Sequence, residues 1–226
     1  MWRGEGRLSR GSSAKTSSPD RSQLMRILCL HGWRTSGSIL REQMSDISAV
    51  LEAGIGPALH LHFPDAPHTA SGPPQDVVQA TWPGIPYFEW WDKLEDGSYS
   101  GADATLAFLS DIDRTHGPFE GVVGFSQGGA LAALCCAGGL TSPLPSLRFA
   151  LIISGFCPAD KGLHSTIQAA APLTVPAVLT HGNRDFNQSA SLTLAGLWSQ
   201  DSVTVVEHGG GHVVSNFTWS FLQLIV

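Results

Sequence analysis

The chain has 226 residues, 42% of them hydrophobic and 14% charged, and its formal net charge is −6 at pH 7. This length suffices for one substantial hydrophobic core and is typical of a single α/β domain. The acidic balance, without a basic stripe, argues against a nucleic-acid partner. The longest strongly apolar stretch, residues 130–140, is too short and too glycine-interrupted for a membrane span.

The first 22 residues differ from the rest of the chain in their charge. They carry five basic and two acidic side chains, and they lack the apolar centre of a secretory signal. We predict a disordered tail over residues 1–22, with an organellar transit segment as the alternative, followed by one domain over residues 23–226.

The cysteines lie in apolar runs without the spacing of a disulfide framework or a zinc site. They are Cys29, Cys135, Cys136 and Cys157. This pattern favours reduced, buried thiols and a cytoplasmic protein.

From residue 24 onwards, apolar runs typical of strands alternate with helical patterns. We expect strands at residues 24–30, 58–63, 121–125, 148–154, 177–181 and 203–207. We expect helices at residues 38–53, 102–115, 128–136 and 189–198, with a short helix or an irregular end at 217–226. This alternation predicts a mostly parallel sheet with helices on both faces.

Residues 68–101 form the irregular part of the chain, and a loop of this length is uncommon unless it is functional or disordered. Its aromatic cluster, Tyr87, Phe88, Trp90 and Trp91, favours an ordered loop. These side chains either wall an acyl pocket or anchor the loop by their own burial. Just before this loop, His60 and His62 share one face of a strand. No third ligand accompanies them, so we predict neither a metal site nor a cofactor.

A Gly-x-Ser-x-Gly pentapeptide spans residues 124–128, with Ser126 at its centre. It follows an apolar strand and precedes an alanine-rich, helix-prone run. This strand–turn–helix setting is what a nucleophile elbow requires, whereas the alternative is a glycine-rich turn with an incidental serine. We predict that Ser126 is the nucleophile of an α/β-hydrolase fold, in a single domain without a large cap.

A serine nucleophile needs a base, and in this fold the base is the last member of the triad along the chain. His212 follows the last predicted strand, after three glycines that allow the backbone to fold back over the serine. We predict that His212 is the base. His208 is its nearest rival, and His181 is better explained as a packed structural group.

The acid that orients the base should lie on the loop after the preceding strand. Asp185 is the carboxylate there, and we predict it as the acidic partner. Asp160, on the loop after the strand at 148–154, is the alternative. Asp185 could instead cap the helix that follows it.

Two backbone N–H groups should stabilise the oxyanion of the reaction. One is expected from Gln127, directly after the nucleophile. The other is expected from Trp33, in the loop that follows the first strand, where His31-Gly32 permits close backbone approach.

Several segments together resemble the FSH family of serine hydrolases, and within it the OVCA-two-like esterases. They are Leu30-His31-Gly32-Trp33, Asp65-Ala66-Pro67-His68, the pentapeptide with Gly129, Ile153-Ser154-Gly155-Phe156 and Gly210-Gly211-His212. The resemblance extends over about residues 25–213. It implies hydrolysis of carboxylic esters, thioester release by some members, and catalytic roles for Ser126, Asp185 and His212.

The chain departs from the family pattern in two places. Asn183 stands where relatives often carry an additional aspartate, which makes Asp185 the sole candidate on that loop. The chain also ends 14 residues after His212, so we expect an abbreviated closing helix.

These observations predict a serine hydrolase that acts on a small-molecule ester or thioester. The rival hypothesis is a small-molecule receptor of the same fold with little turnover, because fold analogy alone does not decide function. An acyl-protein thioesterase remains open, and a protease is less expected. Neither the acyl chain length nor the oligomeric state follows from the sequence.

Overall fold

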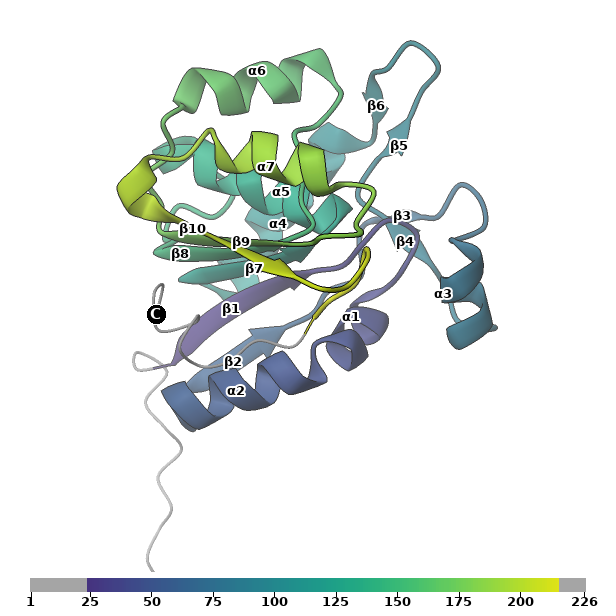
Figure 1. The fold of residues 1–226 in the computed structure, drawn as a ribbon, viewed down its shortest axis with the longest axis horizontal. Helices are drawn as coiled ribbons and strands as arrows, with labels where there is room; N and C mark the ends of the chain where they lie inside the picture. Colours follow the sequence, from purple (N-terminus) through teal and green to yellow (C-terminus); the bar gives the residue numbers. More distant parts are fainter. Residues whose placement is uncertain (1–23, 216–226) are drawn as a thin grey trace, which may run out of the picture.

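The computed structural model describes residues 24–215 of the chain. The tail predicted at residues 1–22 and the helix or irregular end predicted at 217–226 lie outside the described residues. The described part is built around a six-stranded sheet in the order β10-β9-β8-β7-β1-β2 (Figure 1). Every neighbouring pair in this sheet is parallel, which confirms the predicted architecture.

Each predicted strand has a counterpart in this sheet. The strands are β1 (Met25–Leu30), β2 (Leu59–His62), β7 (Gly121–Phe125), β8 (Phe149–Ile153), β9 (Ala177–Gly182) and β10 (Val203–His208). All residues of β7, β8 and β9 are buried. Continuous apolar runs are expected in strands that are covered on both faces.

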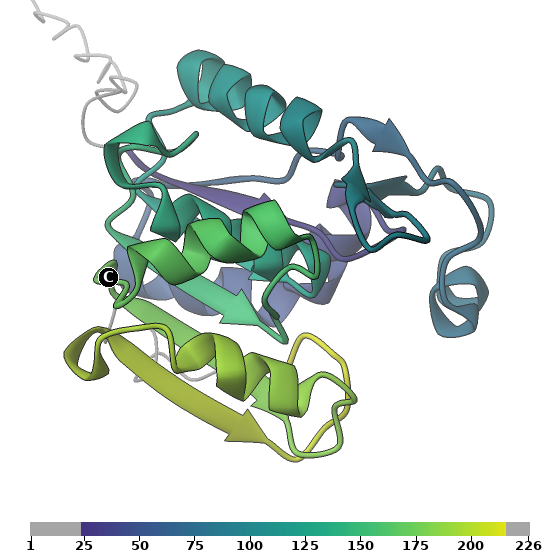
Figure 2. The same cartoon turned by 90° about the horizontal axis from the view of Figure 1, so that it is seen from above.

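Helices cover both faces of the sheet. On one face lie α1 (Gly37–Gln43) and α2 (Ser45–Ile55), which pack on β-strand residues such as Ile27 and Val123. On the other face lie α4 (Ala102–His116), α5 (Gln127–Ala137), α6 (Lys161–Ala170) and α7 (Gln188–Ala195). Figure 2, seen from this second side, shows these helices lying over the strands.

Two helical features differ from the expectation. The helix expected at 38–53 is two helices that meet at Met44, whose N–H bonds to the carbonyls of Glu42 and Leu40. The apolar pattern continues through the break, because Leu40, Met44, Ile47 and Leu51 all face the same core. Periodicity therefore could not reveal the break.

Helix α6 was not expected at all. Its large apolar residues, Leu163 and Ile167, stand four positions apart on one face, but this single pair is a short signal in a helix of ten residues. Its start is set by Asp160, whose carboxylate accepts hydrogen bonds from the N–H groups of Gly162 and Leu163. This side chain satisfies two of the N–H groups that a helix start leaves free.

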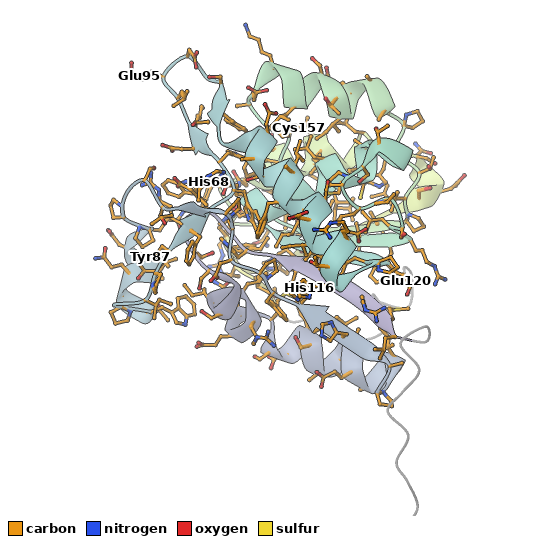
Figure 3. All side chains as sticks on the ribbon, turned by 180° about the vertical axis from the view of Figure 1, so that it is seen from behind. His68, Tyr87, Glu95, His116, Glu120 and Cys157 are labelled. Carbon is orange, nitrogen blue, oxygen red and sulfur yellow. The ribbon has the colours of Figure 1, made fainter. Side chains whose placement is uncertain are left out.

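Residues 68–101 form an ordered lobe at the end of the sheet where the parallel strands finish. It contains β3 (His68–Thr69) paired with β4 (Phe88–Glu89), α3 (Asp76–Thr81), and the hairpin of β5 (Asp92–Lys93) and β6 (Tyr99–Ser100). Figure 1 shows α3 and the hairpin on opposite sides of β3 and β4, and Glu95 marks the hairpin tip in Figure 3.

The cysteines are free, and Cys29, Cys135 and Cys136 are buried as expected. Cys157 differs, because it is only half-buried in the loop before α6. Within residues 24–215, none of the helices has the length and hydrophobicity that a membrane crossing requires.

Candidate active site

Ser126 occupies a strained turn between β7 and α5. Its backbone has φ 55° and ψ −113°, a region that side-chain-bearing residues rarely adopt. The flanking residues must be glycines, because a Cβ at Gly124 would collide with the Gly128 backbone and one at Gly128 with the Leu30 carbonyl. The turn thus presents the serine hydroxyl above the sheet edge, at the start of a helix.

Several residues with strained backbone lie at the carboxyl ends of the strands, near Ser126. Among the described residues, three non-glycine residues have positive φ, namely Arg34, Ser126 and Ser154. They follow β1, β7 and β8, which are neighbours in the sheet. Such strain costs on the order of 1–3 kcal/mol per residue, and it is typical of functional sites.

His212 lies within hydrogen-bond distance of Ser126. Its Nε2 is 2.9 Å from Ser126 Oγ and its Nδ1 is 2.9 Å from Asp185 Oδ1. The imidazole ring contacts the rings of Phe125 and Phe186, at centroid distances of 5.0 and 4.3 Å. The glycine-rich turn that carries it is tied to the neighbouring loop, because the Arg184 N–H donates to the Gly210 carbonyl.

The Asp185 carboxylate accepts hydrogen bonds from two groups besides His212. Ser154 donates its hydroxyl to Asp185 Oδ2 at 2.5 Å, and the Asn187 N–H donates to Oδ1 at 2.7 Å. Burial by itself would raise the pKa of Asp185, but these hydrogen bonds and the nearby His212 outweigh it, so the pKa lies below its ordinary value. The carboxylate is therefore charged at neutral pH and accepts from three partners.

The competing candidates lie elsewhere. Asp160 caps α6 and is not a partner of His212. His208 ends β10, where its Nδ1 accepts from the Gly210 N–H. His181 is buried in β9, with Nδ1 against the Gly182 carbonyl at 3.4 Å, and His164 Nδ1 faces the Pro158 carbonyl. Among these groups, the structure brings only His212 and Asp185 together with Ser126.

Two cavities meet at Ser126, and we call them the smaller and the larger cavity. The smaller cavity, of about 260 Å³, extends toward α3, and its wall includes Val78, Thr81 and His212. The larger cavity, of about 650 Å³, extends toward the β5–β6 hairpin, and its wall includes Gln127 and Cys157. Trp33 and Ser126 line both cavities.

The two expected oxyanion donors come from the start of α5 and from the loop after β1. Gln127 is the first residue of α5, where backbone N–H groups have no partner within the helix. Trp33 follows β1, and both residues line the larger cavity with Ser126. The Trp33 ring is packed under the Arg34 guanidinium at 4.2 Å from its centroid.

The four aromatic side chains of the lobe have different surroundings. Trp91 lines the larger cavity and stacks on Tyr99 at 5.2 Å. Trp90 is fully buried and donates its Nε1–H to the His31 carbonyl, so it anchors the lobe instead of lining either cavity. Phe88 packs partly buried against the core, and Tyr87 donates its hydroxyl to the Trp82 carbonyl near α3 (Figure 3).

Sequence reasoning missed three side chains that organise the site. The Gln127 amide accepts from the Trp90 N–H and donates to the Trp91 carbonyl, which fixes the lobe to α5. Arg34 pairs with buried Glu89 at 3.0 Å and also donates to Ser71 Oγ. Ser154 stood in the Ile-Ser-Gly-Phe segment, but no local signal points from that serine to Asp185.

No cluster of His, Cys, Asp or Glu side chains able to hold a metal ion occurs within residues 24–215. His60 and His62 do stack, at 6.4 Å between ring centroids, and His62 also stacks on His116 at 4.7 Å.

The loop that carries Trp33 begins at a buried, neutral histidine. His31 Nδ1 donates to the Gly32 carbonyl at 2.8 Å, and Nε2 accepts from the Ala66 N–H at 3.0 Å. Burial lowers the pKa of His31 to about 4, against the smaller opposing effects of the Gly32 carbonyl and Asp65. Protonation would also remove the acceptor that Ala66 needs.

This histidine makes stability depend on pH. In the unfolded chain His31 takes up a proton near pH 6.5, whereas the folded chain resists protonation down to about pH 4. The unfolded state therefore binds more protons in this window, so stability falls as pH drops through it, by about 3 kcal/mol. We expect the free energy of unfolding of His31→Gln, measured by chemical denaturation, to fall less between pH 7 and pH 4 than that of the wild type. The exposed His60→Gln variant should lose as much stability as the wild type over the same pH range. If His31→Gln also loses that much, His31 is not the source of the pH dependence.

Comparison with known proteins gives a consistent result. The family model described as serine hydrolase (FSH1) matches residues 21–218. Esterase OVCA2 of Bos taurus is 32% identical over 208 residues, which cover 84% of this chain and 89% of that protein. Esterase OVCA2 of Homo sapiens is 30% identical over 207 residues, with coverages of 84% and 89%.

Solved structures show the same fold. Esterase PE8 superposes with a TM-score of 0.58 at 21% identity, covering 89% of this chain and 93% of that one. A carboxylesterase from Mesorhizobium loti gives a TM-score of 0.54 at 16% identity, with coverages of 90% and 87%. These neighbours are α/β-hydrolase esterases, in agreement with the fold class predicted from the nucleophile elbow.

Proposed function

This chain belongs to the serine hydrolase (FSH1) family, and on that premise we propose that it hydrolyses carboxylic esters through an acyl-enzyme on Ser126. One observation carries the proposal. The hydroxyl of Ser126, the imidazole of His212 and the carboxylate of Asp185 form a continuous chain of hydrogen bonds, each contact with the ring being 2.9 Å long. This is the geometry that activates a serine for attack on a carbonyl.

The first half of the reaction forms the acyl-enzyme. Ser126 Oγ attacks the carbonyl carbon while its proton passes to His212 Nε2. Asp185, charged and buried against Nδ1–H, stabilises the imidazolium that results. The N–H groups of Trp33 and Gln127 donate hydrogen bonds to the developing oxyanion, each contributing about 3 kcal/mol to transition-state stabilisation.

The first half ends when His212 Nε2–H gives its proton to the leaving oxygen and the alcohol departs, which leaves the acyl-enzyme. The second half restores the enzyme. A water molecule then attacks the acyl carbon and passes a proton to Nε2, and Ser126 recovers its proton as the carboxylic acid leaves. A thioester would follow the same path with a thiol as the leaving group, and the proposal covers both.

Covalent labelling tests the proposal directly. Ser126 Oγ should attack the phosphorus of a fluorophosphonate and expel fluoride, and mass spectrometry should locate the phosphonyl adduct on the peptide that contains Ser126. The same preparation should turn over p-nitrophenyl butyrate, and prior labelling should abolish that turnover. Heat-denatured protein, which lacks the His212 contact, should not be labelled.

The outcome also separates the enzyme from the receptor hypothesis. Saturable ligand binding without turnover of any ester in a graded series would contradict the proposal and favour a receptor. A label on another serine would contradict the role of Ser126.

A further inference from the structure

The two cavities at Ser126 differ in size, in lining and in their relation to the histidine. His212 lines the smaller cavity, whereas Gln127 lines the larger one. The volumes are about 260 and 650 Å³. A substrate bound across Ser126 therefore has a separate cavity available for each part, and the chemistry decides which part goes where.

The position of the proton donor orients the substrate. The leaving oxygen must come within hydrogen-bond distance of His212 Nε2, because that nitrogen protonates it. The carbonyl oxygen points to the N–H groups of Trp33 and Gln127, and the fourth bond of the tetrahedral carbon is to Ser126 Oγ. The acyl substituent then extends away from His212, on the side of Gln127.

We propose that the acyl group occupies the larger cavity and the leaving alcohol the smaller one, so that the enzyme is selective for esters of bulky acids with small, apolar alcohols. This inference rests on the proposed function and specifies its substrate class. Trp33 separates the two sites, held in place by the Arg34 guanidinium that packs on its ring.

The lining of each cavity fits its assigned group. The larger cavity has aromatic walls in Trp91, which stacks on Tyr99, and in Phe156, with Lys93 and Asp92 on the hairpin side. Planar aromatic walls bury large apolar groups at little entropic cost. The smaller cavity is lined by Val77, Val78 and Trp82 around α3, which suit a short alkyl group.

Isomeric esters test the orientation without a change in overall hydrophobicity. Ethyl hexanoate and hexyl acetate have the same formula, as do ethyl 3-phenylpropanoate and 3-phenylpropyl acetate. We expect kcat/KM to be about tenfold higher for the isomer with the bulky acid in each pair, because the added carbons enter the larger, aromatic-walled cavity in one orientation and the smaller cavity in the other. Equal values, or a preference for the bulky alcohol, would overturn the assignment.

Two matched variants assign each cavity separately. Cys157→Phe adds a ring to the half-buried wall of the larger cavity, and Thr81→Phe adds one to the exposed end of α3 at the smaller cavity. Cys157→Phe should lower the ratio of kcat/KM between the isomers about tenfold, and Thr81→Phe should raise it. Because each ratio is measured within one preparation, partial unfolding cancels. The reverse pattern, or equal ratios in both variants, would contradict the inference.

Failure of this inference differs from failure of the proposed function. If the chain shows no Ser126-dependent turnover of any ester, the proposed function is wrong. If turnover depends on Ser126 but the isomers are hydrolysed equally, only the assignment of the cavities is wrong.

Discussion

Replacement of Ser126 by alanine is expected to lower kcat for p-nitrophenyl butyrate by about a million-fold, to near the rate left by the oxyanion donors and substrate binding. The substitution removes the attacking oxygen and the hydrogen bond to His212 Nε2. It keeps the Cβ, so the strained backbone at φ 55° is unchanged. The loss should therefore come from chemistry and not from unfolding.

Steady-state kinetics with Ser126→Ala, together with thermal denaturation, check this expectation. Ser110→Ala makes the same chemical change at an exposed position of α4, where the hydroxyl donates to the Leu106 carbonyl. This control should keep its activity within about twofold, since surface substitutions away from the site have small effects. A Ser126→Ala variant that folds and retains even a hundredth of the wild-type rate would show that another group is the nucleophile.

Replacement of Asp185 by asparagine is expected to lower kcat by about ten-thousand-fold. The asparagine amide can donate an N–H to His212 Nδ1, which favours the imidazole tautomer that carries its proton on Nε2 and cannot accept the serine proton. The substitution also removes the negative charge that stabilises the imidazolium. It also changes the acceptors used by Ser154 and by the Asn187 N–H. The effect should appear in kcat more than in KM, because these contacts act on the base and not on the substrate.

Asp160→Asn is the matched control for this prediction. Asp160 was the competing acid, and in the structure its carboxylate accepts hydrogen bonds from the first turn of α6. Asparagine is also a good N-cap, so this variant should lose at most about 1 kcal/mol of stability and keep its activity within about twofold. If Asp160→Asn loses more activity than Asp185→Asn, the assignment of the acid is wrong.

The predicted strands correspond closely to the observed ones because their signal is continuous. In β7 and β8 every residue is apolar or glycine, and β9 begins with three apolar residues; such runs are expected in strands that are buried on both faces. The helices were harder to predict. A face shared by Leu40 and Met44 with Ile47 concealed the break between α1 and α2. In α6 the apolar face has only two large residues, Leu163 and Ile167, and the Asp160 cap marks where the helix begins.

The aromatic lobe shows a second limit. From the sequence, Trp90 and Trp91 were equal candidates for a pocket wall. In the structure both side chains are buried in the same core cluster, but of the two only Trp91 also lines the larger cavity. Which of the two faces the cavity depends on the register of the segment, and that register is fixed by the Gln127 amide, far away in the sequence.

By itself, the sequence determined the parallel sheet, the position of the nucleophile candidate and the chain order of its partners. These features depend on local constraints. The turn at Ser126 requires small residues at 124 and 128, and strands with continuous apolar runs must be buried. The tertiary structure alone decided that Asp185 and not Asp160 contacts His212, that Ser154 supports this aspartate, and that Trp33 stands between two unequal cavities. The reason is that the carboxyl ends of all the parallel strands lie at one edge of the sheet, while the residues that meet there are 27 to 86 positions apart in the chain.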